Sequence, residues 1–130
     1  MALQAPRIGM DVVVLARVRR ALEGKQEQWR RRVFTEGEWT HAEASSDSFA
    51  ALALCFAAKE AAFKVLGTGW GGGVAWQDVE VQRGTEIEAR IALHGRAAEI
   101  AALDDLMLTA SLAHTDELAV AMVLGQAAQK

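Results

Sequence analysis

The chain has 130 residues, a net charge of −3 and a hydrophobic fraction of 52%, which fits a single domain over residues 1–130 with a sizeable core. Its acidic balance argues against a general nucleic-acid-binding protein, because such proteins carry a basic excess. One cysteine excludes a disulfide framework and a cysteine-based zinc site, and the lack of a long apolar run or signal-peptide pattern predicts a cytoplasmic protein with no membrane partner.

The chain begins with a predicted strand that contains one acid. Residues 7–14 are apolar and rich in valine, and β-branched residues favour strands. Asp11 lies near the middle of this segment. Such a residue is usually a carboxylate at a strand end or in a turn. The other interpretation is a functional carboxylate.

Three helices are predicted next. Apolar residues at helical spacing indicate helices over residues 15–22 and 26–34, with Gly24 ending the first. Thr35 and Glu38 have the spacing of a capping box, which predicts the start of the third. The first two helices carry a concentration of arginines: Arg17, Arg19, Arg20, Arg30, Arg31 and Arg32. Such a group is usually a solvated face, but it would also suit an acidic partner.

The middle of the chain is predicted to form one long apolar helix. Residues 49–66 are apolar around almost the whole circumference, so this helix should lie centrally. Lys59, Glu60 and Lys64 interrupt the apolar pattern. The pair Glu60 and Lys64 shares one face, which fits a surface ion pair or a functional site. Residues 67–73 are rich in glycine and fit either a phosphate-binding loop or a flexible connector.

The second half of the chain is predicted to form two antiparallel hairpins with a helix between them. The elements are a strand over residues 74–83 with a bend near Asp78, a strand over 87–93, a helix over 95–103, and strands over 106–114 and 118–124. Together with the first half, this order predicts an α+β domain whose mostly antiparallel sheet packs on the long helix.

The charged residues suggest chemistry when they are taken together. Asp11 and Glu60 are hard oxygen ligands with no soft ligand beside them, which suits Mg²⁺ held jointly with substrate phosphates. Lys64 could neutralise a phosphate or protonate a leaving group. The turn at His114 and Thr115 adds possible phosphate donors, although His114 also fits an ordinary turn histidine. These residues predict a site for a phosphorylated ligand.

The sequence resembles the holo-acyl-carrier-protein synthase type of 4′-phosphopantetheinyl transferase in five stretches: GMDVVVLARV, RVFTEGE, FAAKEAAFKVLGTG, WQDVEV and SLAHT. The resemblance implies a Mg²⁺-dependent enzyme of fatty-acid or polyketide biosynthesis. Such an enzyme transfers 4′-phosphopantetheine from coenzyme A to a serine of an apo acyl carrier protein and releases 3′,5′-ADP. It also implies a homotrimer with active sites between subunits.

The resemblance also implies roles for individual residues. Asp11 and Glu60 would hold Mg²⁺ and the coenzyme A diphosphate, and Lys64 would assist the leaving group. The coenzyme A contacts would be Lys59, Gly67, Thr68, Gly69, His114 and Thr115. On the first helix, Arg17 and Arg20 would meet the acidic helix of the carrier protein.

The sequence departs from the family pattern at several positions. Val14 replaces a usual glutamate, Leu54 and Cys55 replace a glycine and a nucleotide-contacting arginine, Ala113 replaces a serine or threonine, and residues 84–86 replace a Gly-Lys-Pro turn. Each charge-assisted hydrogen bond lost to coenzyme A would weaken binding by roughly 1.5–3 kcal/mol. The alternative is therefore a degenerate, non-catalytic module that binds a carrier protein or coenzyme A.

Overall fold

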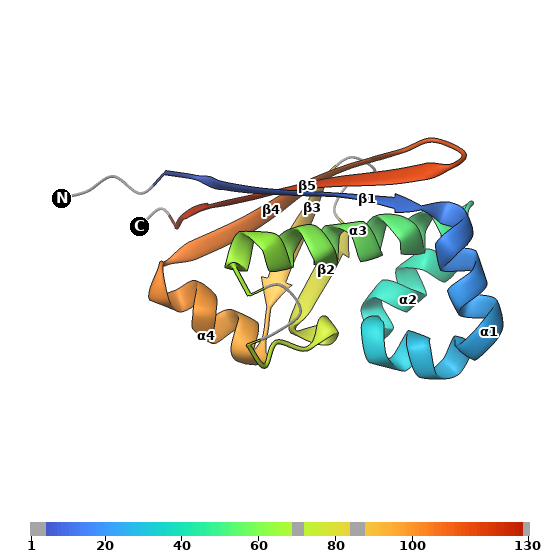
Figure 1. Ribbon diagram of the computed structural model, residues 1–130, viewed down its shortest axis with the longest axis horizontal. Helices are drawn as coiled ribbons and strands as arrows, with labels where there is room; N and C mark the ends of the chain where they lie inside the picture. The colour runs from blue at the N-terminus through green and yellow to red at the C-terminus, as the bar shows by residue number, and fades with distance from the viewer. Residues whose placement is uncertain (1–4, 69–71, 84–87, 129–130) are drawn as a thin grey trace.

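One antiparallel sheet and a layer of helices form the part of the chain that the structure, a computed structural model, describes: residues 5–68, 72–83 and 88–128. The helices lie on one face of the sheet, and the other face is open (Figure 1). The strands, in the order β1-β5-β4-β3-β2, are β1 (Arg7–Val14), β5 (Leu118–Ala127), β4 (Leu106–His114), β3 (Glu88–Leu93) and β2 (Val79–Arg83). The helices are α1 (Leu15–Val33), α2 (Glu36–Glu43), α3 (Ser48–Leu66) and α4 (Gly95–Leu103). The predicted α+β fold with a mostly antiparallel sheet is confirmed.

Helix α3 supplies most of the helical side of the core. Asp47 caps its start by accepting a hydrogen bond from the Ala50 amide, and Gly67 ends it with φ of 80°, a conformation that favours glycine. Five of its alanines are fully enclosed, with 0% exposure: Ala53, Ala57, Ala58, Ala61 and Ala62. Small side chains let the sheet approach the helix closely, so α3 lies directly beneath β1 and β5.

The two helices predicted over residues 15–22 and 26–34 are one helix, α1. Gly24 does not end it, which corrects the prediction. The position is exposed, and a side chain there would contact nothing within 4 Å. Glycine inside a helix costs about 0.5–1 kcal/mol. Packing of Val18, Leu22 and Val33 into the core on either side outweighs that cost.

The second half of the chain follows the predicted order with shifted boundaries. Trp76–Asp78 form a 3₁₀ turn, so the regular strand β2 begins only at Val79. Asp78 causes the predicted bend, because its carboxylate accepts a hydrogen bond from the Ala75 amide. Strand β5 runs to Ala127, beyond the predicted end at 124, since it stays paired with β4 as far as Leu106.

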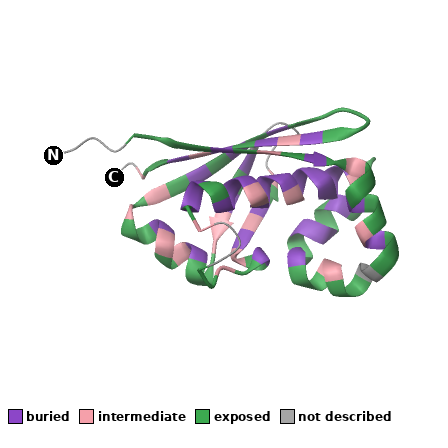
Figure 2. Cartoon of the chain, viewed as in Figure 1, coloured by how far each residue is buried: buried purple, intermediate pink, exposed green. Residues whose placement is uncertain are grey.

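The open face of the sheet is apolar. Seven large apolar side chains on β1, β4 and β5 are at least 38% exposed there: Ile8, Met10, Val12, Val14, Met107, Leu118 and Met122. The registers place Met10 opposite Met122 and Val14 opposite Leu118, so the exposed apolar residues of β1 and β5 adjoin each other on this face. Figure 2 shows exposed residues along this side of the sheet, away from the helices. Among the described residues, no helix is long and apolar enough to span a bilayer.

Candidate active site

Asp11, Glu60 and Lys64 meet where β1 crosses α3. Strand alternation turns Asp11 toward the helix, and its side chain is 14% exposed. Lys64 places its Nζ 3.0 Å from Asp11 Oδ1 and 2.8 Å from the carbonyl oxygen of Met10. Glu60 lies one helical turn before Lys64 and shares a hydrogen bond with Asp11. The three predicted catalytic residues therefore form one cluster.

The surroundings of the Glu60 carboxyl group favour its protonated form. Partial burial, the hydrogen bond to Asp11 and the charge of Asp11 raise the pKa of Glu60 to about 7, although Lys64 and Arg17 oppose the shift. Two adjacent carboxylates cannot both ionise cheaply unless a cation neutralises them. The donor set, two hard oxygens at a cavity wall, fits Mg²⁺, which takes one or two carboxylates and completes its shell with water and phosphate.

A cavity of about 240 Å³ opens beside the carboxyl groups, between α1, β1 and α3. Asp11, Glu60 and Arg17 contribute polar groups to its lining, and Trp29 and Phe56 contribute aromatic rings. The two aromatic rings lie 5.5 Å apart. Sequence reasoning did not single out these rings, because each fits the core pattern of its own helix. The cavity lining thus combines charged and apolar side chains.

Arg17 and Arg20 occupy different positions on α1. Arg17 lines the cavity and lowers the pKa of Glu60 against the raising effect of burial. Arg20 is exposed on the helix surface, where its Nε donates to the Ala16 carbonyl oxygen at 3.4 Å. A molecule that docks along α1 would thus contact the basic surface and the cavity mouth together.

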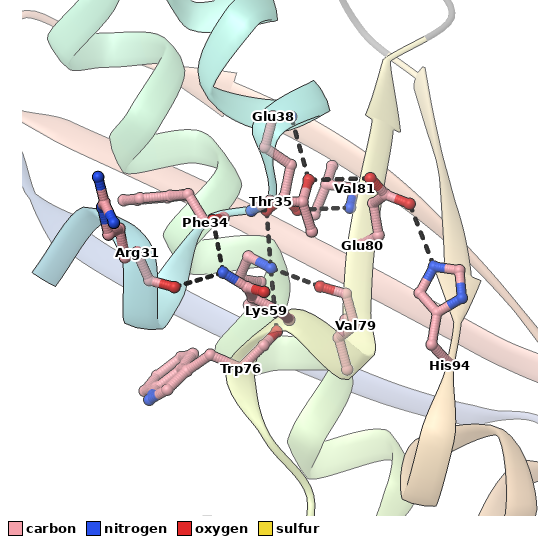
Figure 3. Close-up of polar contacts among 11 residues, drawn as sticks. Arg31, Phe34, Thr35, Glu38, Lys59, Trp76, Val79, Glu80, Val81 and His94 are labelled. Atoms are coloured by element: carbon pink, nitrogen blue, oxygen red, sulfur yellow. Dashed lines mark hydrogen bonds and ion pairs between the residues drawn. The ribbon is translucent and has the colours of Figure 1, made fainter. Parts of the chain in front are cut away.

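Lys59 is not at the site. Its side chain is 0% exposed and forms an ion pair of 2.9 Å with Glu38, which is 1% exposed. The ammonium also donates to the carbonyl oxygens of Trp76 and Val79 (Figure 3). All three protons of the ammonium have acceptors, so none is left for a phosphate. The prediction that Lys59 binds coenzyme A is corrected: it is a buried structural residue.

Glu38 completes this buried network. Beyond its pair with Lys59, it accepts hydrogen bonds from the Thr35 amide at 2.8 Å and the Val81 amide at 2.7 Å. The predicted capping box is confirmed, since Thr35 also accepts from the Glu38 amide. The network joins the start of α2 to α3 and β2 (Figure 3). The spacing of Thr35 and Glu38 in the sequence predicts the capping box. No sequence pattern predicts that Glu38 also pairs with Lys59, because Lys59 is distant in the chain.

The described residues among the predicted nucleotide-binding set lie in two places, the end of α3 and the β4–β5 turn. Gly67 ends α3 and donates its amide to Phe63, and Thr68 is half-buried beyond it. Gly69 lies outside the described residues. His114 and Thr115 stand at the tip of the β4–β5 hairpin, where Thr115 Oγ1 accepts from the Leu118 amide at 3.0 Å. Within the described chain, the bonds recorded for His114 and Thr115 stay in that turn, so a nucleotide role for them remains a prediction.

The departures from the family pattern fall in distinct environments. Leu54 and Cys55 are buried, and burial raises the pKa of the Cys55 thiol well above its usual range. Cys55 is therefore a neutral core residue. Val14 is 41% exposed on the open sheet face, opposite Leu118. Ala113 is also exposed, on β4.

A family profile described as the 4′-phosphopantetheinyl transferase superfamily matches residues 7–122. The chain belongs to this superfamily. The predicted resemblance is thereby confirmed, and the carboxyl pair, the lysine and the cavity all fall within the matched residues.

Curated relatives in the superfamily carry the name holo-[acyl-carrier-protein] synthase. The protein from Solibacter usitatus is 37% identical over 117 residues, which cover 89% of this chain and 94% of the relative. The protein from Gloeobacter violaceus is 43% identical over 119 residues, which cover 90% and 89%. Both matches span nearly the whole length of each protein.

Solved structures of the superfamily share the fold. The holo-[acyl-carrier-protein] synthase of Bacillus anthracis, in complex with coenzyme A (3′,5′-ADP), has a TM-score of 0.75 at 28% identity and covers 93% of this chain and 96% of its own. The Helicobacter pylori enzyme in complex with coenzyme A has a TM-score of 0.77 at 26% identity, covering 92% and 100%. The enzyme of Neisseria meningitidis, 22% identical with a TM-score of 0.81, covers 92% and 96% and supports the fold alone.

Proposed function

We propose that this chain transfers 4′-phosphopantetheine from coenzyme A to a serine hydroxyl of an apo acyl carrier protein and releases 3′,5′-ADP. The observation that carries the proposal is the hydrogen-bonded pair of Asp11 and Glu60 beside Lys64, at the wall of a cavity. The relatives named holo-[acyl-carrier-protein] synthase and the related structures with coenzyme A support the choice of substrates. Fatty-acid or polyketide biosynthesis would use the product.

Asp11 and Glu60 would hold Mg²⁺. When the metal ion is bound, it would neutralise negative charge on the diphosphate of coenzyme A. One of the two carboxylates, or a water that they hold, would accept the proton of the carrier serine as its oxygen attacks the β-phosphate. Lys64 has a flexible stem and is 54% exposed, so its ammonium can leave Asp11 and donate to the departing phosphate of 3′,5′-ADP. Hydrogen-bond donors that point at the negative charge developing in the transition state are a main source of catalysis in phosphoryl transfer.

The carrier protein would dock along α1. Arg20 offers an exposed cation, and Arg17 lies at the cavity wall beside Glu60. An acidic helix placed on this surface would bring its neighbouring serine to the carboxyl groups. The charges would act mainly on encounter rate and orientation, because exposed pairs are weak individually.

The assembly that we propose is a homotrimer with each active site between two subunits. It is supported by the apolar open face of β1, β4 and β5, since a contiguous apolar surface of this kind usually marks an interface. In this assembly the coenzyme A contacts would come from Gly67, Thr68 and Gly69 of one chain and from His114 and Thr115 of its neighbour. A cytoplasmic location is also proposed, because the free, buried thiol of Cys55 suits a reducing compartment.

The second candidate is a non-catalytic module that binds a carrier protein or coenzyme A. The buried, neutral Cys55, in the place of a nucleotide-contacting arginine, favours it. Calorimetry separates the two candidates. Carrier binding that is indifferent to Mg²⁺ and proceeds without turnover would favour the module.

Mass spectrometry of an apo carrier protein tests the transferase directly. After incubation with coenzyme A and Mg²⁺, the carrier should gain the mass of phosphopantetheine. The gain should disappear with Glu60→Gln and persist with Glu99→Gln, a control that removes an exposed carboxylate on α4. No gain with any of several carriers would refute the activity.

A further inference from the structure

Strand β1 makes its tightest approach to α3 at Gly9. A Cβ atom at this position would lie 2.1 Å from the carbonyl oxygen of Ala61 and 3.0 Å from Cγ2 of Val65. The first contact is with helix backbone, which cannot turn aside as a side chain can. Glycine inside a strand often marks such a close backbone approach. No other residue fits here without moving the strand away from the helix.

This contact lies directly beside the carboxyl pair. Ala61 follows Glu60 in the chain, and Gly9 precedes Asp11 by two residues on the same face of β1. Between them, the carbonyl oxygen of Met10 accepts from Lys64 at 2.8 Å. Three successive residues of β1 thus meet one turn of α3. The distance between strand and helix at Gly9 decides how far Asp11 reaches toward Glu60.

We propose that Gly9 is a positioning residue that sets the separation of the Asp11 and Glu60 carboxyl groups and thereby the affinity of the pair for a divalent cation. The inference rests on the metal site of the proposed function. Mg²⁺ demands near-ideal octahedral geometry at short ligand distances, so a strand displaced by a fraction of an ångström would lose affinity. Ligand sites depend on supporting contacts of this kind.

Gly125 on β5 offers a matched control. A Cβ atom there would lie 2.5 Å from Cγ1 of Val65, so Gly125→Ala overpacks the same sheet–helix contact. Gly125 pairs with Arg7, four residues before Asp11 along β1. Both substitutions should lower the melting temperature by several degrees, because overpacking a close contact destabilises it. Only Gly9→Ala should affect the carboxyl pair.

The experiment measures Mg²⁺ binding by calorimetry and Mn²⁺ binding by electron paramagnetic resonance, on full-length protein without coenzyme A. We expect Gly9→Ala to raise the dissociation constant at least tenfold and Gly125→Ala to change it less than twofold. An unchanged constant in folded Gly9→Ala, or an equal loss in both variants, would overturn the inference.

Asp11→Glu and Glu60→Asp keep the inference testable if Gly9→Ala does not fold. Each keeps the charge and alters the reach by one methylene. With the backbone separation fixed at Gly9, each should weaken cation binding at least tenfold, and retained affinity in both would overturn the inference. Wild-type transfer activity reports separately on the proposed function. If the wild type is active but Asp11→Asn binds the cation as tightly as the wild type, Asp11 is not a metal ligand. That result would also rule out the proposed role of Gly9, while leaving the transfer activity established.

Discussion

Lys59 and Glu38 form an ion pair of 2.9 Å with side chains that are 0% and 1% exposed. Removing one member leaves an uncompensated charge in the core, which typically costs about 3–5 kcal/mol. Lys59→Met should therefore lower the free energy of unfolding by about that amount, measured by urea denaturation.

The matched control for that substitution is Lys64→Met, which removes a lysine of the same helix from a half-exposed ion pair. It should change the free energy of unfolding by less than about 1 kcal/mol, while reducing transfer activity. The double substitution Lys59→Met with Glu38→Leu should recover part of the lost stability, since no charge then stays buried alone. Equal losses for Lys59→Met and Lys64→Met would contradict the structural role of Lys59.

The raised pKa of Glu60, about 7, predicts a pH-dependent response to magnesium. Without metal, the raised pKa stabilises the fold below the ordinary carboxyl range, and this contribution is lost as the pH rises through about 7. At pH 6 a cation must displace the proton, whereas at pH 8 it meets two carboxylates. Mg²⁺ should therefore raise the melting temperature more at pH 8 than at pH 6. Glu60→Gln should abolish that difference; a larger shift at pH 6 would contradict the raised pKa of Glu60.

The apolar open face predicts which substitution would break the proposed trimer. Met122→Glu puts a carboxylate on that face, opposite Met10, and should convert the proposed trimer to monomers in sedimentation experiments. Leu103→Glu is the control, because Leu103 is 81% exposed but lies at the end of α4, off the sheet. Dissociation by Leu103→Glu, or a trimer that survives Met122→Glu, would place the interface elsewhere.

A site shared between chains predicts complementation. Glu60→Ala and His114→Ala should each be inactive alone, whereas mixed trimers formed by unfolding and refolding them together should regain part of the activity. Sites that combine an intact Glu60 from one chain with an intact His114 from another account for the recovery. Transfer assays on the mixture and on each parent measure it. Mixtures no more active than their parents would confine the site to one chain.

The basic surface of α1 predicts an effect on the carrier alone. Arg20→Glu should raise the KM for the carrier protein about tenfold, or roughly 1.4 kcal/mol, and leave the KM for coenzyme A unchanged. Added salt should reduce the difference. Arg96→Glu on α4 is the control for charge reversal. A rise in both KM values would mean that Arg20 acts through the fold.

Local patterns in the sequence predicted most of the fold. The capping signal at Thr35 and the strand, turn and helix order of the second half depend on near neighbours, and both predict the observed elements. The prediction that Gly24 ends a helix was wrong because core contacts stabilise α1 on both sides of this residue. Such contacts between distant segments cannot be seen in a local sequence pattern. Tertiary packing overrides intrinsic propensity in such cases.

The sequence predicted some residues of the candidate site correctly and others incorrectly. The four-residue spacing of Glu60 and Lys64 indicated that these charged residues share one face of the helix. The structure places that face beside Asp11. Lys59 was misplaced because a helix that is apolar all round gives no periodicity from which to assign a charged residue to core or surface. Its partner Glu38 is twenty-one positions away in the chain. Gly9 carried no local signal either, because its role depends on a backbone contact between distant segments.

Most of the surface of helix α3 packs in the hydrophobic core, and the rest lines the candidate active site. Its enclosed alanines leave no room for larger side chains, so larger residues there would overpack the core and destabilise the fold. Helix α1 faces the same cavity but has one side in water. Divergence toward new carrier proteins within this lineage should therefore accumulate on α1, while α3 drifts little.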